Sequence, residues 1–253
     1  MSPEVISAPA AASAEAAVPP PARTLLVLGS KPAPALPPTG SYAAIACANA
    51  SGFSARAHGL AAPSLTVVSA VLGSGKGSDE HSLKALRDLP AGLLYLLPRP
   101  LPRDPWRRLL ARLRHWRMQP PWVRHRLARA GLRFERVVVR PIEAYHAMIE
   151  RLTGNDPAVR AAMARKRPST GLVALAVGLT EAGFEHAILA GFDFTLSHAY
   201  GHNPLIDQRG HATSAHADTD VAILEAIQRR HGCLWTSEPA VAARTSLPLL
   251  PPR

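Results

Sequence analysis

Residues 167–238, in the second half of the chain, combine residue types whose spacing suits anion binding and proton transfer. A small polar turn, Pro168 to Gly171, leads into an apolar helix pattern, and an apolar strand pattern then ends in Gly191-Phe192-Asp193-Phe194. A loop rich in histidine follows, and then a second helix pattern. This order predicts a helix N-terminus and a histidine-bearing loop at the same end of a sheet, where open α/β proteins bind ligands. We therefore expect an enzyme.

The charge around the polar turn favours an anionic ligand. The basic triplet at residues 165–167 directly precedes the turn. Free backbone N–H groups and the positive end of the helix dipole would attract a carboxylate or a phosphate at this point. One cation of the triplet, for which we choose Arg167, would point at that anion.

Two earlier apolar runs also end in polar groups. Residues 24–29 (TLLVLG) end at Gly29 and are followed by Ser30, which can present backbone N–H groups and a hydroxyl to a nucleotide or form an ordinary turn. Residues 42–48 (YAAIACA) lead to Asn49, whose amide can make a two-pronged contact with a pyrimidine or a sugar. Asparagine before Ser-Gly is also a common turn former, so both interpretations stay open.

The elements that position these residues form an α/β pattern. Six apolar runs, beginning near residues 24, 43, 65, 92, 134 and 187, predict the strands of a mainly parallel sheet in a Rossmann-like α/β/α sandwich. We expect one domain at 23–245, a disordered leader at 1–22, a tail at 246–253 and a small His-rich lid at 194–216. A chain of 253 residues, 47% of them hydrophobic, can bury the core that this fold needs.

Composition restricts the partners and the compartment. The formal net charge of +11 implies attraction to an anion, which could be nucleic acid, a membrane surface or a phosphorylated substrate. Cys47 and Cys233 lie in or near apolar runs, which is typical of reduced core residues. No apolar run is long enough to span a membrane, and the N-terminus lacks a secretory pattern. We expect a cytoplasmic protein, and peripheral contact with the inner face of a membrane stays open as an alternative.

The segment 99–131 is laced with arginine and tryptophan. Asp104 and Pro105 predict the start of an amphipathic helix, which could lie on an anionic leaflet or pack its apolar side in the core beneath a solvated basic face. We favour core packing. The segment lacks a helix-turn-helix spacing, a zinc pattern and an aromatic-rich strand, so nucleic-acid binding is the less favoured interpretation. The apolar side chains of the predicted helix are Trp106, Leu109, Leu110, Leu113 and Trp116.

The turn and the following strand end resemble the core motif of sialyltransferases. Residues 167–171 (RPSTG) and Gly191-Phe192 are similar to the animal enzymes, whose motif contains Pro-Ser-Thr-Gly and whose next strand ends in Gly-Phe. The bacterial enzymes of family 42 are similar over the remainder, which has Tyr200 after the strand, a histidine-bearing lid that ends at His216, and an acidic helix start at residues 218–220. The resemblance is specific over about seventy residues, is weaker but in register over the first seventy, and has no counterpart for the segment 99–131.

This resemblance implies a GT-A variant fold and a metal-independent transferase. Such an enzyme moves an ulosonic acid of the sialic acid type from its cytidine monophosphate (CMP) conjugate to a glycan hydroxyl and inverts the anomeric centre. It uses no cofactor beyond the donor substrate. The chemistry suits the residues, because a donor with a carboxylate and a phosphate leaving group needs cations, hydroxyls and helix N-termini, and histidine is a natural base near neutral pH.

The resemblance also implies individual roles. The base that deprotonates the acceptor hydroxyl would be His216, with His211 as its substitute. Tyr200 would donate its phenol to the departing phosphate, and Asn49 would contact the cytidine or the donor sugar. The remaining donor-binding residues would be Gly29, Ser30, Arg167, Ser169, Thr170, Gly171 and Asp193.

Three positions depart from the family's pattern. Ser30 replaces an asparagine, His216 lies four rather than five residues before Asp220, and His211 is followed by Ala212 rather than tyrosine. The donor therefore stays open between sialic acid and Kdo, the related eight-carbon acid of bacterial envelope polysaccharide. A non-catalytic protein that keeps the fold and binds a membrane surface or nucleic acid is a third interpretation. We expect no metal site, because the histidines form no i, i+4 pair on a predicted helix and have no cysteine partner.

Overall fold

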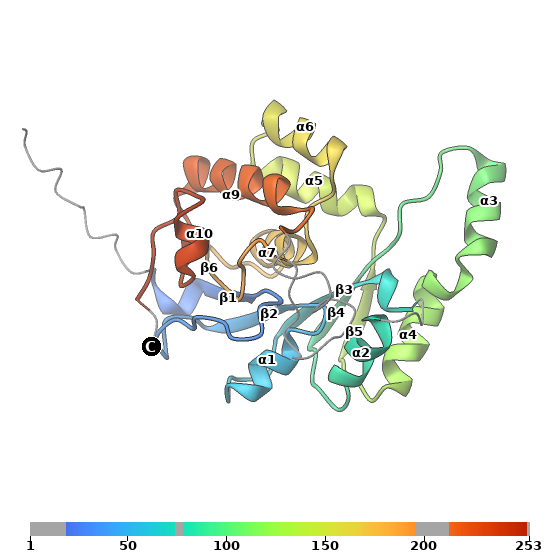
Figure 1. Cartoon of the computed structure of the whole chain (residues 1–253), viewed down its shortest axis with the longest axis horizontal. Coiled ribbons are helices and arrows are strands. Elements are labelled where there is room, and N and C mark those ends of the chain that lie inside the picture. The colour runs from blue at the N-terminus through green and yellow to red at the C-terminus, as the bar shows by residue number, and fades with distance from the viewer. Residues whose placement is uncertain (1–18, 74–77, 196–212, 252–253) are drawn as a thin grey trace, which may run out of the picture.

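The computed structural model of the chain describes residues 19–73, 78–195 and 213–251. Within these ranges the centre is one seven-stranded sheet in the order β5-β4-β3-β2-β1-β6-β7, and all neighbouring strands are parallel (Figure 1). The predicted α/β/α fold with a mainly parallel sheet is confirmed. The strands are β1 (Thr24–Leu28), β2 (Ala44–Ala48), β3 (Leu65–Ser69), β4 (Leu93–Leu97), β5 (Arg136–Val139), β6 (His186–Ala190) and β7 (Leu234–Thr236).

Helices cover both faces of this sheet (Figure 1). Leu25 and Val27 of β1 lie in one core cluster, whereas Leu26 and Leu28 lie in the cluster on the other side. Parallel strands need such cover because both of their faces are apolar. One layer contains α5 (Ile142–Leu152), α6 (Pro157–Arg165), α7 (Thr170–Thr180) and α9 (Ala217–His231), and the other contains α1 (Gly52–Ala57), α2 (Ser78–Ala85) and α4 (Pro120–Arg129).

Helix α7 is the most deeply buried helix of the described fold. Every residue from Gly171 to Gly178 is buried, and the helix packs against α5 and against strands β1, β2, β3 and β6. A helix that is apolar on all sides can be accommodated only in a core position of this kind. Its N-terminus is thereby held at one edge of the sheet. The remaining short helices are η1 (Pro21–Arg23), η2 (Ala70–Gly73), η3 (Trp116–Met118) and α10 (Pro239–Ala242).

The strand order changes direction beside β1. From β1 the chain proceeds outward through β2, β3, β4 and β5, and it then returns to place β6 on the opposite side of β1. In open α/β sheets, the carboxyl ends of the strands at such a reversal leave a crevice in which ligands bind. The fold thus predicts a binding site beyond Leu28 and Ala190.

The structure corrects the expected packing of α3 (Pro105–Arg114). The helix begins as predicted, with Asp104 Oδ1 accepting a hydrogen bond from the Arg107 amide at 2.7 Å. The expectation that its apolar side packs in the core is wrong, because no residue of α3 is buried and the helix stands away from the sheet (Figure 1). The reason is that α2 and α4 already cover this part of the sheet, with Leu86 and Leu127 in its core.

The C-terminal segment also differs from the expected tail. Leu250 N donates to Thr236 O at 2.7 Å, and Thr236 N donates to Pro248 O at 3.0 Å, so residues 247–250 lie beside β7. Leu247 and Leu250 are buried. The burial of these two leucines offsets the entropy that the segment loses when it becomes ordered. The proline-rich composition of the segment gave no indication of this burial.

Cys47 and Cys233 are free and buried, as expected of core residues. Burial raises the pKa of the Cys47 thiol to about 12 and that of Cys233 to about 11, so both thiols are protonated and unreactive near neutral pH. None of the helices within the described residues is long and apolar enough to cross a membrane.

Candidate active site

A pocket of about 320 Å³ lies at the predicted crevice. Its floor is formed by the carboxyl ends of β1, β2, β3, β4 and β6, and the N-terminal turns of α7 and α9 border it. Every candidate site residue within the described ranges lines this pocket, although the residues come from widely separated parts of the chain. They are Gly29, Ser30, Asn49, Arg167, Ser169, Thr170, Gly171, Asp193 and His216.

The N-terminus of α7 opens into the pocket. Ser169 is its N-cap, and its hydroxyl accepts a hydrogen bond from Leu172 N at 3.3 Å. The backbone amides of Thr170 and Gly171, in the first turn, have no acceptor among the described residues. Two unpaired N–H groups at the positive end of a buried helix form a site for an anion.

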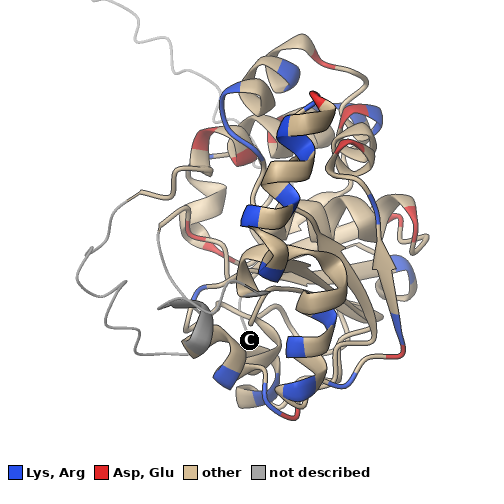
Figure 2. Ribbon diagram, turned by 90° about the vertical axis from the view of Figure 1, so that its right-hand side faces the viewer, with Lys and Arg blue, Asp and Glu red and all other residues tan. Residues whose placement is uncertain are grey.

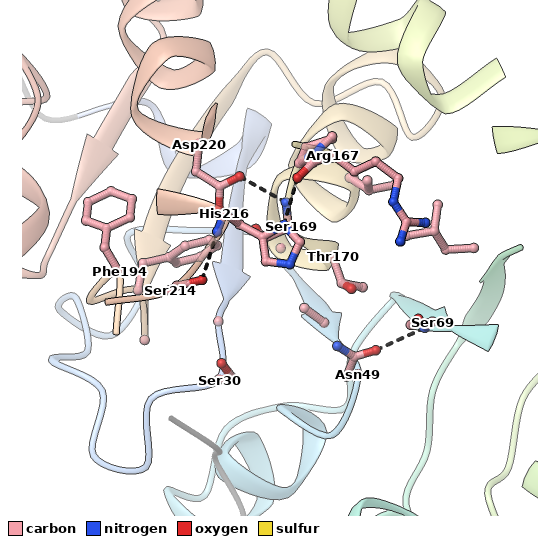
Figure 3. A pocket seen from close by; sticks show the side chains of 18 of the residues that line it. Ser30, Asn49, Ser69, Arg167, Ser169, Thr170, Phe194, Ser214, His216 and Asp220 are labelled. Carbon is pink, nitrogen blue, oxygen red and sulfur yellow. Dashed lines mark hydrogen bonds between the residues drawn. The ribbon is translucent and has the colours of Figure 1, made fainter. Parts of the chain in front are cut away.

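Asp220 holds the turn that precedes α7. Its carboxylate, only 4% exposed, accepts a hydrogen bond from Ser169 N at 2.9 Å, across 51 positions of sequence (Figure 3). Burial raises the pKa of Asp220 to about 7, although the bonds from Ser169 act in the opposite direction. The sequence indicated only a helix-opening aspartate, whose cap would be local, so this link between α9 and α7 was missed.

The imidazole of His216 has a defined tautomer. Nδ1 lies 2.7 Å from the carbonyl oxygen of Arg167. Because a carbonyl can only accept, Nδ1 carries the proton, and Nε2 keeps its lone pair and points into the pocket (Figure 3). Burial lowers the pKa of His216, and the charges of Lys166 and Arg167 add to this effect, whereas the bond to the Arg167 carbonyl opposes it. A neutral imidazole with a free Nε2 is the form that can accept a proton.

The Arg167 guanidinium is exposed at the pocket rim. It forms no ion pair with any carboxylate of the described residues. Its charge therefore remains available to an anion bound at the N-terminus of α7.

Asn49 presents one end of its amide to the pocket. Oδ1 accepts a hydrogen bond from Ser69 N at 3.0 Å, and Nδ2 faces the pocket (Figure 3). The residue has a φ of 51°, a left-handed conformation that asparagine tolerates better than most residues. The structure thus combines the two sequence interpretations, because Asn49 forms the turn and also offers a donor to a ligand.

Glycines allow the floor of the pocket to close. A Cβ on Gly29 would lie 2.3 Å from the carbonyl oxygen of Gly191, and a Cβ on Gly171 would lie 2.6 Å from the ring of Phe192. Both positions therefore require glycine for packing. For Gly171 this packing explains the residue type independently of the predicted role in donor binding.

Lys31 and Asp193, two charged residues near the pocket, have partners within the protein. The buried Glu238 pairs with Lys31 and accepts hydrogen bonds from Ala35 N and Gly191 N, both at 2.8 Å. Asp193 accepts from Thr195 N at 3.0 Å and from the Thr195 hydroxyl at 2.8 Å. These contacts of Lys31 and Asp193 stabilise the loops that follow β1 and β6.

His146 of α5 lines the pocket and was missed by sequence reasoning. Its Nε2 is buried and has no hydrogen-bond partner among the described residues, and burial lowers its pKa. An isolated histidine inside an amphipathic helix pattern carries no motif, so only its position in the fold marks it as a site residue.

Tyr200 and His211 lie outside the described residues, as does most of the expected lid. The ends of that segment meet, because Thr195 pairs with Thr213 in an antiparallel bridge and Ser214 N donates to Phe194 O at 2.8 Å. Among the described residues, no group of three or more histidine, cysteine or acidic side chains could hold a metal ion.

No protein-family model matches the chain, and no curated protein matches its sequence. Solved structures do match its fold. The sialyltransferase CstII from Campylobacter jejuni in complex with CMP aligns with a TM-score of 0.52 at 12% identity, over 92% of this chain and 87% of that chain. CstII with a trisaccharide acceptor and CMP gives 0.51 at 12% identity over 88% and 85%. The α-2,3-sialyltransferase Cst-I from the same organism gives 0.51 at 13% identity, over 90% of this chain and 80% of that chain. The chain therefore has the fold of the bacterial sialyltransferases, as the resemblance of residues 167–220 implied.

Proposed function

We propose that this protein is a glycosyltransferase that moves an ulosonic acid of the sialic acid type from its CMP conjugate to a glycan hydroxyl. The observation that carries the proposal is that one pocket combines the N-terminus of α7, whose first amides have no acceptor among the described residues, with a histidine whose Nδ1 is bonded to a carbonyl and whose Nε2 faces the pocket. The solved structures with the same fold are sialyltransferases, some of them in complex with CMP.

The donor carries two anionic groups, and the pocket offers groups that suit them. The amides of Thr170 and Gly171 bind the donor carboxylate or phosphate, and Arg167 supplies a full positive charge at the rim. Asn49 Nδ2 donates to the cytosine or to the sugar. Because these groups stabilise the charge that develops on the leaving CMP, the proposed reaction requires no metal ion.

His216 is the proposed base. Its Nε2 takes the proton of the acceptor hydroxyl as the oxygen attacks the anomeric carbon, and the bond from that carbon to the CMP phosphate breaks on the opposite face. A single displacement of this kind inverts the anomeric centre. The Arg167 carbonyl, which already accepts the Nδ1 proton, stabilises the imidazolium that forms.

CMP binding tests the site. At a hundred times its Kd, CMP should stabilise the fold by about 2.7 kcal/mol and raise the thermal midpoint by several degrees. Adenosine and uridine monophosphates at the same concentration should raise it much less. Lack of any cytidine-dependent shift would contradict the proposal.

Turnover tests the base. His216→Ala should lower the rate of CMP release from CMP-sialic acid by about 10²- to 10⁴-fold and leave the CMP-induced thermal shift in place. His231→Ala is the matched control, because His231 Nε2 also bonds a backbone carbonyl, that of Leu152, but outside the pocket. Equal rates for the two variants would exclude His216 as the base. CMP-Kdo in the same assay distinguishes the two donors.

A further inference from the structure

Helix α3 exposes a continuous apolar stripe. At about 100° per residue, its tryptophan and three leucines fall within roughly 100° of one another around the helix. Trp106 is 66% exposed and Leu113 is 63% exposed, and no residue of the helix is buried. A soluble surface rarely leaves large apolar side chains together in water without a partner. The stripe consists of Trp106, Leu109, Leu110 and Leu113, and the exposed Trp116 follows it directly.

Arginines flank this stripe on both sides. On the same helical projection, Arg107 and Arg114 border one edge, and Arg108 and Arg112 lie toward the other. None of the four is in an ion pair with a carboxylate of the described residues. Long arginine side chains in such positions can reach the head groups of lipids while their neighbours enter the acyl region.

The surrounding segment strengthens this charge pattern. Residues 99–131 contain ten arginines and one aspartate, a net charge of +9, whereas the rest of the chain contains 19 basic and 17 acidic residues. Figure 2, which turns this side of the molecule toward the viewer, shows the basic residues along the helices of this segment. The positive charge of the protein is thus concentrated on the side that carries the apolar stripe.

Charge and polarity together select the partner. A second copy of the chain, docked stripe to stripe, would bring two sets of arginines together, and like charges at an interface are unfavourable. Nucleic acid would satisfy the arginines and leave the tryptophan and leucines in water. An anionic bilayer satisfies both, since its head groups attract arginine and its acyl boundary accepts the apolar side chains.

We propose that α3 lies in the plane of an anionic membrane surface, with its apolar stripe inserted at the head-group boundary. The helix thereby attaches the protein to the membrane as a peripheral membrane protein. This inference rests on the exposed helix and does not depend on the activity proposed for the pocket. It revises the expectation that the apolar side of α3 packs in the core.

Sedimentation with lipid vesicles tests the proposal. The full chain, without donor, should bind vesicles of phosphatidylcholine with 30% phosphatidylglycerol at least about tenfold more tightly than vesicles of phosphatidylcholine alone, and the preference should decrease as salt is added. Arg107→Glu with Arg112→Glu should weaken binding to the anionic vesicles at least about tenfold. Trp106→Ala and Leu113→Ala should each weaken it severalfold at constant charge.

Matched variants outside α3 test whether binding depends on the position of the substituted residues or only on the change in charge and apolar content. Arg56→Glu with Arg151→Glu changes the net charge equally but on exposed positions of α1 and α5, and Leu249→Ala removes an exposed leucine beside β7. Both control variants should bind the vesicles as the unmodified chain does. Binding that is lost equally in control and α3 variants would overturn the proposal, as would absence of binding to anionic vesicles. If the chain forms a dimer in solution and Trp106→Ala dissociates it, the partner of the apolar stripe is a second copy of the chain and not a membrane.

Discussion

At the residue scale, the backbone determines what His216 can do. The carbonyl of Arg167 accepts a hydrogen bond from Nδ1–H, and the partial burial of the ring lowers its pKa, which favours the neutral form. A base needs both properties, because a protonated imidazole cannot accept the hydroxyl proton and the other tautomer would present N–H to the acceptor. His146, whose buried Nε2 has no hydrogen-bond partner among the described residues, lines the same pocket and is the competing candidate.

The lowered pKa of His216 predicts the pH dependence of turnover. Because burial disfavours the charged form, the imidazole stays neutral below its usual value of 6.5, and kcat/KM should decline only at more acidic pH. Lys166→Gln removes a charge that lowers the pKa, so the acidic limb should move to higher pH. A pH series of donor turnover measures both effects. If the limb instead disappears in His146→Ala and persists in His216→Ala, His146 is the base.

At the scale of elements, the site depends on the contact between the first turns of α7 and α9. Asp220 in α9 accepts the Ser169 amide, and Thr219 donates its hydroxyl to Lys166 O at 3.1 Å. The basic triplet and the cap of α7 are thereby held against the helix that follows His216. One helix thus positions both the anion site and the proposed base.

The raised pKa of Asp220 predicts a pH-dependent stability. In the folded chain Asp220 keeps its proton up to a pKa of about 7, whereas in the unfolded chain it releases the proton near pH 3.8. The contribution of Asp220 to stability is therefore fully present below about pH 4 and is lost as the pH rises to about 7. Asp220→Asn keeps an acceptor for Ser169 N and abolishes the titration. Between about pH 4 and 7 the free energy of unfolding of the variant should rise relative to that of the unmodified chain by up to roughly 1.4 kcal/mol per pH unit.

Urea unfolding at several pH values measures this difference. Asp218→Asn is the control, because Asp218 is two residues away in the same helical turn but is 97% exposed. Its free energy of unfolding should follow the unmodified chain at every pH. Parallel pH profiles for Asp220→Asn and the unmodified chain would show that Asp220 is ionised in the fold.

At the scale of the whole molecule, the candidate pocket and most of the positive charge lie on different elements. The pocket residues lie at the carboxyl ends of the strands, and none of them belongs to α3 or α4. The arginines of residues 99–131 account for most of the net charge of +11. The strongly basic composition is therefore a property of one segment, and the rest of the α/β domain is nearly balanced.

This separation predicts that α3 can be altered without damage to the fold. Arg107→Glu with Arg112→Glu should change the thermal midpoint by less than about 4 °C, because exposed substitutions away from special contacts each change stability by about 0.5 kcal/mol or less. The CMP-induced shift should also be unchanged. Differential scanning fluorimetry with and without CMP measures both. A decrease of the midpoint by about 5 °C or more would show that α3 packs against the domain.

The amino-acid sequence by itself determined the features that depend on neighbours along the chain. Apolar runs identified six of the seven strands, all except β7, and the Pro-Ser-Thr-Gly turn identified the start of α7, because strand periodicity and capping are local. Since parallel strands align their carboxyl ends, Gly29, Asn49 and Gly191 could be expected to meet at one edge. That Asn49 and His216 share a site is implied by the resemblance to sialyltransferases and not by strand periodicity.

The tertiary structure decided what depends on residues far apart in the sequence. The return of β6 to the side of β1 created the crevice. The packing of the later elements placed the Asp220 carboxylate on Ser169 N and the Glu238 carboxylate beside Lys31. The packing of α2 and α4 on the sheet left α3 without a core to join. An amphipathic pattern states that a helix has an apolar side, but the surface that this side meets is set by the rest of the fold.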